Sequence, residues 1–243
     1  QVKSDFVGGA FGSGLRPQYQ LFMATLASLE LKHNVQMVMT RAQMFSFGYR
    51  PEVIHTMKLG CSKDGTLQAL SHHTVGETST FEDFNETIVD WSGLLYKCEN
   101  VNLEYKLTPV QSYTPLDMRA PGGVSGVYAL ECAMDDLAHK AGIDPLEFRR
   151  KNYVDYDQNE DKPFTSKELR ACYDRCEELF GWKNRKDKTT NESHVRTGFG
   201  MATGSWEALQ QKASVSLTMD ATGKFTLKCA TADIGTGTYT VMS

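Results

Sequence analysis

Residues 124–152 read VSGVYALECAMDDLAHKAGIDPLEFRRKN, and this stretch predicts two consecutive helices. The first is expected over 124–141, because its apolar residues recur at the spacing of one helical face. Gly142 is typical of the residue that ends a helix. Asp144 and Pro145 are typical of an N-cap and a first helical position, so a second helix is expected through Asn152.

Strand-like alternation flanks these helices. Strands are expected over 53–62 and 66–78 on either side of the turn Lys63-Asp64-Gly65, and a third over 101–108. Further strands are expected over 2–7, 35–41, 197–203, 213–219 and 225–230, and further helices over 16–32, 87–98 and 166–181. Small residues along one face of the 16–32 helix suggest close packing against a sheet. This mixture predicts an α+β fold of layered mixed or antiparallel sheets with packed helices.

One run of charged and polar residues, 183–194, lacks apolar periodicity and is the best linker candidate. It divides the chain into a first domain over 1–182 and the start of a second over 195–243. The chain opens on Gln1, just ahead of a strand-like run, and closes on Ser243, just after a helix is expected to begin. We therefore expect a fragment of a longer polypeptide.

The composition is that of an ordinary soluble protein. Of 243 residues, 40% are apolar and 23% charged, and the net charge of -4 disfavours a protein that grips nucleic acid. No apolar run approaches the roughly 18 residues of a membrane-spanning helix, and no signal peptide is visible. A cytoplasmic location is expected, and a truncated N-terminus would leave export open.

The six cysteines give no sign of a metal centre. None forms a C-x-x-C pair, so the sequence encodes neither a zinc ribbon nor an iron–sulfur ligand run. Cys172 and Cys176 lie four residues apart on an expected helix, and the absence of a second pair favours packing residues over metal ligands. We expect no protein-ligated metal.

Three glycine-rich loops carry the functional signal: Gly8–Gly14, Met118–Gly123 and Asp233–Gly237. Each follows a strand-like stretch and precedes a helix, and glycine there lets the backbone approach a ligand closely. Helix N-termini favour anions, so together the loops suggest a large anionic ligand held by backbone groups. Three ordinary turns are the alternative. Arg119 adds a cation suited to an oxyanion or a substrate carbonyl, and a loop salt bridge is its alternative role.

The common nucleotide motifs are absent from these loops. None is followed by the Gly-Lys-Ser or Gly-Lys-Thr of a P-loop, and neither Gly12-Ser13-Gly14 nor Gly235-Thr236-Gly237 continues as G-x-G-x-x-G. Binding of ATP or a nicotinamide dinucleotide in its usual form is therefore disfavoured.

Five motifs follow one another along the chain. They are Gly8–Ser13 (GGAFGS), Leu116–Gly122 (LDMRAPG), Ala129–Ala138 (ALECAMDDLA), Asp144–Asn152 (DPLEFRRKN) and Asp233–Gly237 (DIGTG). In type, order and spacing they resemble motifs of the molybdenum hydroxylases, the xanthine dehydrogenase and aldehyde oxidase family. The second motif has the form common in bacterial aldehyde dehydrogenase-like large subunits.

The resemblance implies a molybdopterin-binding large subunit, or a piece of one. Such enzymes bind molybdopterin, often as its cytosine dinucleotide, and the metal is held by the pterin, not by side chains. They hydroxylate an aldehyde or N-heterocycle with water-derived oxygen, and electrons leave through iron–sulfur and FAD partners. Neither nucleic acid nor a membrane is an expected partner.

The resemblance also implies roles for particular residues. The first loop would lie beside the metal, with Phe11 shaping the pocket, and Arg119 would sit in the substrate pocket. These two are the expected catalytic residues, and the expected cofactor-binding set is Gly9, Ala10, Phe11, Gly12, Met118, Arg119, Gly122, Gly235, Thr236 and Gly237.

Three positions depart from purine-oxidising members of the family. Leu15 replaces a glutamate and Pro121 a ring-stacking Phe, which favours aldehydes or other less polar substrates. Thr236 stands where many members have Gln. The family's general base would lie beyond Ser243, so no glutamate is assigned and the chain alone is expected to be inactive.

Two other functions stay open. One is a non-catalytic cofactor-binding or subunit-contact module of the same ancestry. The other is an unrelated anion-binding domain, which the Asp144–Asn152 phrase disfavours.

Overall fold

The computed structural model describes residues 1–4, 9–188, 194–207 and 210–242. Its central sheet has three strands in the order β1 (Val53–Cys61), β2 (Leu67–Ser79) and β3 (Asn100–Val110). β1 and β2 form the expected antiparallel hairpin, whereas β3 runs parallel to β2, with Ala69 opposite Asn100 and Ser79 opposite Val110. The sheet is therefore mixed, because the crossover between β2 and β3, which contains the short helix α3 (Asp90–Leu94), returns the chain in the same direction.

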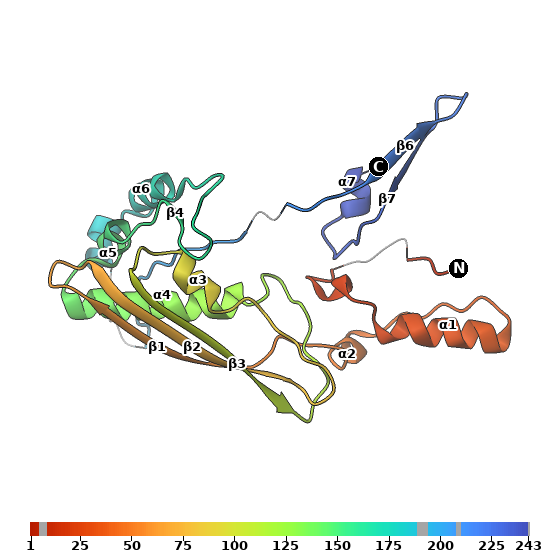
Figure 1. Cartoon of the computed structure of the whole chain (residues 1–243), viewed down its shortest axis with the longest axis horizontal. Helices are drawn as coiled ribbons and strands as arrows, with labels where there is room; N and C mark the ends of the chain where they lie inside the picture. The colour runs from red at the N-terminus through yellow and green to blue at the C-terminus, as the bar shows by residue number, and fades with distance from the viewer. Residues whose placement is uncertain (5–8, 189–193, 208–209, 243) are drawn as a thin grey trace.

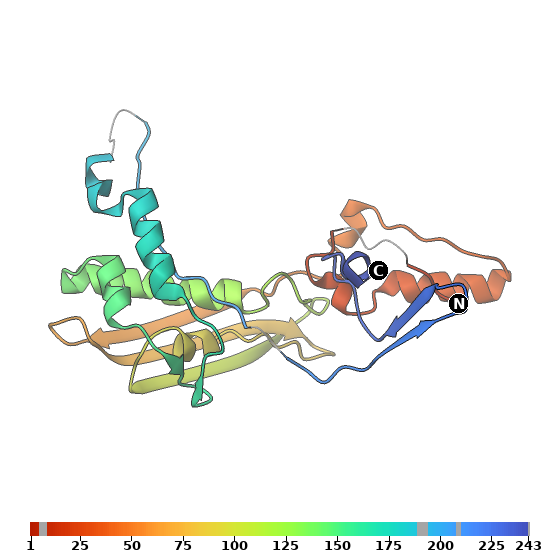
Figure 2. The same ribbon diagram turned by 90° about the horizontal axis from the view of Figure 1, so that it is seen from above.

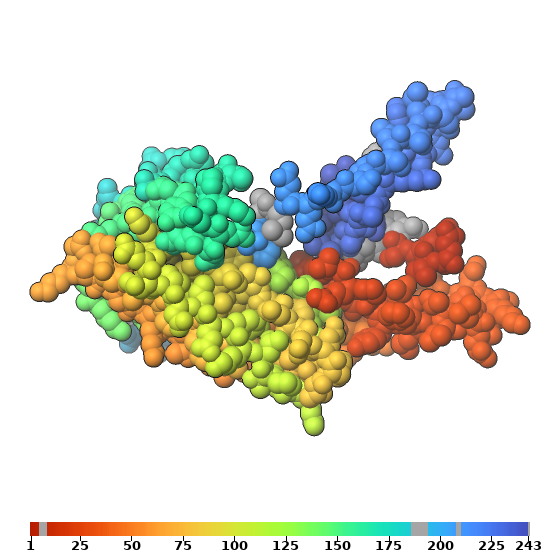
Figure 3. Space-filling view, in the orientation of Figure 1, coloured from red at the N-terminus to blue at the C-terminus, as the bar shows by residue number. Residues whose placement is uncertain are grey.

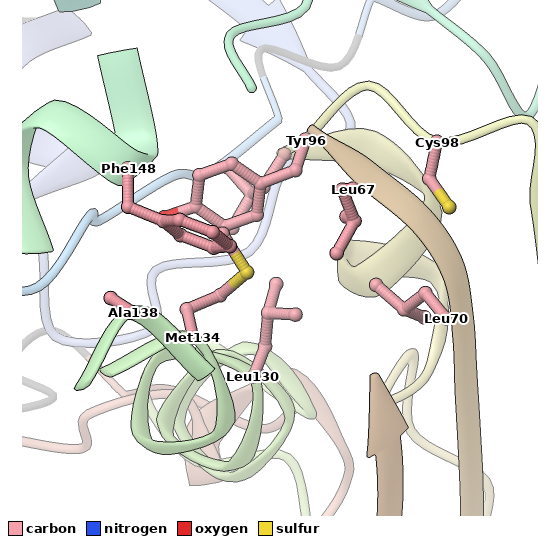
Figure 4. Packing of buried hydrophobic residues seen from close by; sticks show 9 residues of the cluster. Leu67, Leu70, Tyr96, Cys98, Leu130, Met134, Ala138 and Phe148 are labelled. Atoms are coloured by element: carbon pink, nitrogen blue, oxygen red, sulfur yellow. The ribbon is translucent and has the colours of Figure 1, made fainter. Parts of the chain in front are cut away.

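Helix α4 (Gly123–Ala141) lies along one face of this sheet (Figure 1). It begins and ends within one residue of the expected bounds, and Gly142 follows in the left-handed conformation with φ 67°. Leu130 and Met134 point from α4 toward Leu70 and the ring of Phe148, as Figure 4 shows. The apolar stripe read from the sequence is thus the helix side of the main core.

Helix α5 (Pro145–Lys151) follows as expected. The Asp144 carboxylate accepts hydrogen bonds from the N–H groups of Leu146 and Glu147, at 2.9 and 3.3 Å. The side-chain amide of Asn152 donates to the carbonyls of Gly65 and Phe148 and its oxygen accepts from Leu67 N–H. Asn152 therefore ties α5 to the β1–β2 turn by bonds that are fully buried.

A buried polar cluster joins α4 and α5 to Thr203, which belongs to a later segment that lies against the body of the molecule, residues 53–182. Arg149 is fully buried, and its Nε donates to Glu131 Oε2 at 2.8 Å. The same oxygen accepts from Thr203 N–H at 2.7 Å, and the other receives the hydroxyl of Tyr96. The Thr203 hydroxyl also contacts that of Tyr173 at 2.5 Å. A buried carboxylate and guanidinium are tolerated because almost every polar atom has a partner.

The rest of the body consists of short elements. Strands β4 (Tyr156–Asp157) and β5 (Lys162–Pro163) pair, and helix α6 (Leu169–Phe180) leads into a 3₁₀ helix, η2 (Trp182–Lys188). A second core cluster gathers Leu146, Tyr173 and Trp182, against which Phe199 and Met201 pack. Across the described residues, no helix is both long and apolar enough to cross a bilayer.

Two arms extend from one end of the body, as Figures 1 and 2 show. The first arm, residues 1–50, contains η1 (Ser13–Leu15), α1 (Tyr19–Leu31) and α2 (Arg41–Met44). The second arm, residues 210–242, contains the antiparallel hairpin of β6 (Val215–Met219) and β7 (Phe225–Cys229), then α7 (Thr238–Met242). No described residue of either arm is buried. The expected packing of α1 against a sheet is therefore absent among the described residues.

Several sequence expectations on local structure were wrong. Residues 35–40 lie in no strand, and Thr40 caps α2 through a reciprocal bond with Gln43. Of the helix expected over 87–98, only α3 forms. Residues 197–203 form no strand, because Thr203 N–H bonds to a side chain of the body instead of a neighbouring strand. Of the strand expected over 2–7, residues 2–4 are not in a strand and 5–7 lie outside the described residues. The α+β class itself is confirmed.

Candidate cofactor-binding site

The three glycine loops meet where the two arms join the body (Figure 3). Arg119 N–H donates to the carbonyl of Phe11 at 2.7 Å, which joins the second loop to the first. Gly12 N–H reaches the carbonyl of Ile234 at 3.4 Å, which joins the first loop to the third. Segments that lie more than a hundred residues apart in the sequence therefore form one surface.

In the first loop, backbone shape requires small residues. Gly12 has φ 108°, a conformation that other residues rarely adopt, and a Cβ there would lie 2.9 Å from the carbonyl oxygen of Asp117. Phe11 itself has φ 52°, and its ring is 63% exposed. A Cβ on Gly9 would lie 3.1 Å from that ring. Ala10 accepts from both N–H and hydroxyl of Ser13, which closes the turn.

Asp117 directly precedes the second loop, and its carboxylate accepts a hydrogen bond from Arg16 Nε at 2.7 Å. The side-chain hydrogen bond with Asp117 raises the pKa of Arg16. Arg16 follows the first loop, so this ion pair is a second link between the two loops. Ala120 has φ 52°, and Gly122, at the N-cap of α4, has φ 72°. Gly122 is buried against the backbone of Thr87, so a Cβ on it would overlap the Thr87 carbonyl.

The third loop is shaped by Asp233. Its Oδ1 accepts from Gly235 N–H at 2.8 Å and from Gly237 N–H at 3.3 Å. Although loss of solvent opposes it, these backbone bonds hold the pKa of Asp233 below its ordinary value. Both glycines have positive φ, and Thr236 between them is exposed, its hydroxyl 3.2 Å from that of Thr238. The loop is thus a self-contained turn ahead of α7.

Arg119 places a cation at the junction of the loops. Its side chain is exposed, and within the described part of the chain its guanidinium has neither an ion pair nor a hydrogen bond. The salt-bridge role that competed for Arg119 is therefore not seen there. Its backbone carbonyl and that of Ala120 accept from Arg50, at 2.6 and 3.5 Å. Met118 is half-buried beside it.

Sequence reasoning missed three residues of this site: Arg16, Arg50 and Asp117. Their partners lie 69 to 101 positions away, so no local pattern could have paired them. The site offers an exposed aromatic ring, a free guanidinium and loops with few bulky side chains. Such a surface can hold a polar, anionic ligand largely through backbone groups. Within the described ranges, no three His, Cys, Asp or Glu residues gather as metal ligands.

Two family models match the chain, and both are described as molybdopterin cofactor-binding domains. One matches residues 1–153 and the other residues 175–243. The residues that the first model matches therefore include two of the three glycine loops, and those that the second model matches include the third.

Curated relatives match over the whole chain. The aldehyde oxidoreductase molybdenum-binding subunit PaoC of Escherichia coli K12 is 31% identical over 252 residues. The putative xanthine dehydrogenase molybdenum-binding subunit XdhA of the same strain is 26% identical over 260 residues. In both cases 100% of this chain aligns with 34% of the relative. The chain thus spans about a third of the length of these relatives.

Solved structures have the same fold. The aldehyde oxidoreductase of Desulfovibrio gigas superposes with a TM-score of 0.77 at 23% identity, over 90% of this chain and 25% of that chain. The quinoline 2-oxidoreductase of Pseudomonas putida 86 superposes with a TM-score of 0.76 at 19% identity, over 94% and 33%. Together with the matches of the family models, these findings show that the chain belongs to the molybdopterin cofactor-binding domains of the molybdenum hydroxylase family.

Proposed function

We propose that this chain supplies part of the molybdopterin site of a molybdenum hydroxylase that oxidises an aldehyde or an N-heterocycle. The convergence of the three glycine loops carries this proposal, because unrelated turns would have no reason to contact one another. We also propose the domain division expected from the sequence, with 183–194 linking a first domain over 1–182 to a second over 195–243. The family models stop and start between residues 153 and 175, which supports two units but not this boundary.

The residues at the junction fit such a cofactor. Gly12, Gly235 and Gly237 all have positive φ, so the loops keep a backbone shape without bulky side chains. The Arg119 guanidinium, which has no partner among the described residues, complements an anionic ligand. The proposed cofactor-contacting residues are Gly9, Ala10, Phe11, Gly12, Met118, Arg119, Gly122, Gly235, Thr236 and Gly237. When bound, the molybdenum cofactor supplies the oxygen transfer and accepts the electrons of the reaction.

The side chains of this chain would bind and orient. The exposed Phe11 ring offers an apolar wall that excludes water and fixes the plane of a flat substrate. The Arg119 guanidinium would present N–H donors to a substrate carbonyl and stabilise negative charge that develops on its oxygen. Buried Gly122 shapes the backbone between Arg119 and α4. Leu15 and Pro121 in place of polar or aromatic residues favour a weakly polar substrate.

The remaining functional features of the proposal come from the family. The pterin would be its cytosine dinucleotide form, electrons would pass to iron–sulfur and FAD partners, and the enzyme would work in the cytoplasm. The general base would be supplied by residues outside this chain. The names of the relatives, an aldehyde oxidoreductase subunit and a putative xanthine dehydrogenase subunit, support this substrate range.

The test is cofactor retention in the native protein that contains this chain. Gly12→Ala places a Cβ against the second loop, whereas Gly223→Ala changes a turn glycine of similar φ with open space around it. Elemental analysis for molybdenum and fluorescence of the oxidised pterin should show at least about a tenfold loss in Gly12→Ala only. Molybdenum retained after Phe11, Gly12 and Arg119 are all replaced would overturn the site. Retention of the cofactor without turnover of any aldehyde or heterocycle would favour a non-catalytic module.

A further inference from the structure

We propose that Arg50 is a positioning residue for the loop that carries Arg119. This inference rests on the proposed function for the purpose of the loop, but its geometry and its test do not need the cofactor. Arg50 belongs neither to the three glycine loops nor to any of the five motifs.

Arg50 donates hydrogen bonds to carbonyl groups of the loop. Its Nη2 lies 2.6 Å from the carbonyl oxygen of Arg119, and Nη1 lies 3.5 Å from that of Ala120. In a planar trans peptide the N–H points away from the C=O, so the Ala120 N–H is directed away from Arg50. Pro121 has no N–H at all. One planar guanidinium thus fixes two successive peptide groups, which a lysine could not do.

The loop needs such a restraint because its backbone is strained. Ala120 and Phe11 both have φ 52°, a conformation that costs a residue with a Cβ free energy. The two strained residues are joined through the bond from Arg119 N–H to the Phe11 carbonyl. Strained backbone persists only where neighbouring groups fix it from several directions. Arg50 supplies the restraint on one side of this pair of loops.

Glu86 lies buried beside the end of this loop. The residue is 3% exposed, and neither carboxylate oxygen has a hydrogen-bond partner within the described chain. The backbone of the next residue, Thr87, lies against Gly122. Burial raises the pKa of Glu86, and the positive charge of Arg50 opposes that rise. The charge of Arg50 thus favours the ionised carboxylate, and this attraction is a secondary support for the position that the hydrogen bonds to the loop carbonyls define.

These contacts fix the backbone from which the Arg119 side chain extends. The Arg119 guanidinium has no partner in the described chain, so only its backbone can determine where it starts. Held by Arg50 at the carbonyls and by Phe11 at the N–H, the Arg119 Cα stays in one place beside the first loop. A substrate-binding arginine gains affinity from such preorganisation.

The test is limited trypsin digestion of the full chain at the Arg119–Ala120 bond. Cleavage reports how often the loop opens, and cleavage after Lys63 in the β1–β2 turn is the internal reference. Pro51 follows Arg50, so trypsin does not cut there and Arg50→Met leaves the map of cleavage sites unchanged. We expect Arg50→Met to accelerate cleavage at Arg119 at least about tenfold relative to Lys63.

Further variants keep the test decisive. Arg50→Lys should lie between wild type and Arg50→Met, because an ammonium retains the charge but not the fork. Glu86→Gln, which keeps the shape, should accelerate cleavage by about threefold. The control is Arg41→Met, since Arg41 belongs to the same arm and lies over the Phe45 ring. It removes its own cleavage site, because Ala42 follows, but the ratio of cleavage after Arg119 to cleavage after Lys63 is still measured. Cleavage at Arg119 that stays within twofold of wild type in Arg50→Met would overturn the proposal. That result would not touch the cofactor assignment, which is tested by molybdenum content.

Discussion

The body and the arms of this chain are stabilised differently. The body, residues 53–182, contains every residue of the main core, including fully buried Leu130, Phe148 and Met134. In the described arms no residue is buried, although α1 exposes Phe22, Leu26 and Leu29. A helix that is apolar on all sides is stable only when something covers it. Two of the three glycine loops nevertheless lie in the arms, so the site depends on both regions.

The largest effect is expected from the polar cluster of the body. Glu131→Ala leaves the Nε of the buried Arg149 and the Thr203 N–H without their acceptor, and it removes one of the two carboxylates that pair with Arg149. We expect it to lower the free energy of unfolding by about 4 kcal/mol. Glu30→Ala, on exposed α1, should change it by less than about 0.5 kcal/mol. Urea unfolding followed by circular dichroism measures both, and equal losses would remove the contrast between body and arm.

A matched leucine pair sharpens the comparison. Leu130 is 0% exposed and Leu29 is 70% exposed, on α4 and α1 respectively. Leu130→Ala should cost about 3 kcal/mol through lost burial and a cavity, and Leu29→Ala at most about 0.5 kcal/mol. Unfolding of the full chain is again the measurement. A cost above 1.5 kcal/mol for Leu29→Ala would mean that α1 is covered in solution.

The body should also lose stability in acid through His72. Its ring is fully buried, 2.9 Å from that of His55 and 2.8 Å from the Ser92 hydroxyl. Burial, followed by the charges of His55 and His73, lowers the pKa of His72 from 6.5 to about 4. Protonation therefore favours the unfolded chain, and stability present above pH 6.5 is lost as the pH falls toward 4.

The expected loss is on the order of 3 kcal/mol over that window. It is measured as the difference in pH dependence of unfolding between wild type and His72→Gln. His33→Gln, at the exposed end of α1, is the control and should follow wild type. If His72→Gln keeps the full slope, the acid sensitivity belongs to other groups.

The smallest contrast compares two hairpin-turn glycines. Gly65 of the body has φ 86°, and an added Cβ would overlap the side chain of Ile143. Gly223 of the second arm has φ 83° and open space. Backbone strain alone should cost about 1 kcal/mol in Gly223→Ala, and Gly65→Ala should cost about 1 kcal/mol more. The melting temperatures of the two variants test this order, and a reversal would mean that the arm hairpin is the more tightly packed.

Local structure was predictable where the hydrogen bonds of an element join residues that are close in the sequence. The α4 stripe, the Asp144 cap and the Lys63-Asp64-Gly65 turn all formed as expected. Prediction failed where alternating apolar residues were buried against a neighbouring surface and did not belong to a strand. Phe199, Met201 and Thr203 alternate like a strand, yet they pack on the body and pair with no strand. A period of two shows which residues face inward, but not what they face.

The candidate site was predictable in its parts only. The glycine loops could be recognised because positive φ and close backbone approach demand glycine locally. Arg50 and Asp117 could not be recognised, since an arginine or an aspartate in a loop is ordinary. Their significance depends on the carbonyls of Arg119 and Ala120 and on Arg16, which folding brings to them.

The sequence alone thus determined the helices with strong periodicity, the turn chemistry and the three loops, because each depends on residues within a few positions. Only the tertiary structure decided that β3 lies parallel to β2 and that Gly12 meets Ile234. It also decided that Arg50 binds the backbone carbonyl of Arg119, whose side chain has no partner in the part of the chain that the structure describes. These outcomes depend on contacts between distant residues, and local spacing does not specify which distant surfaces will bury each other's apolar atoms and satisfy each other's polar groups.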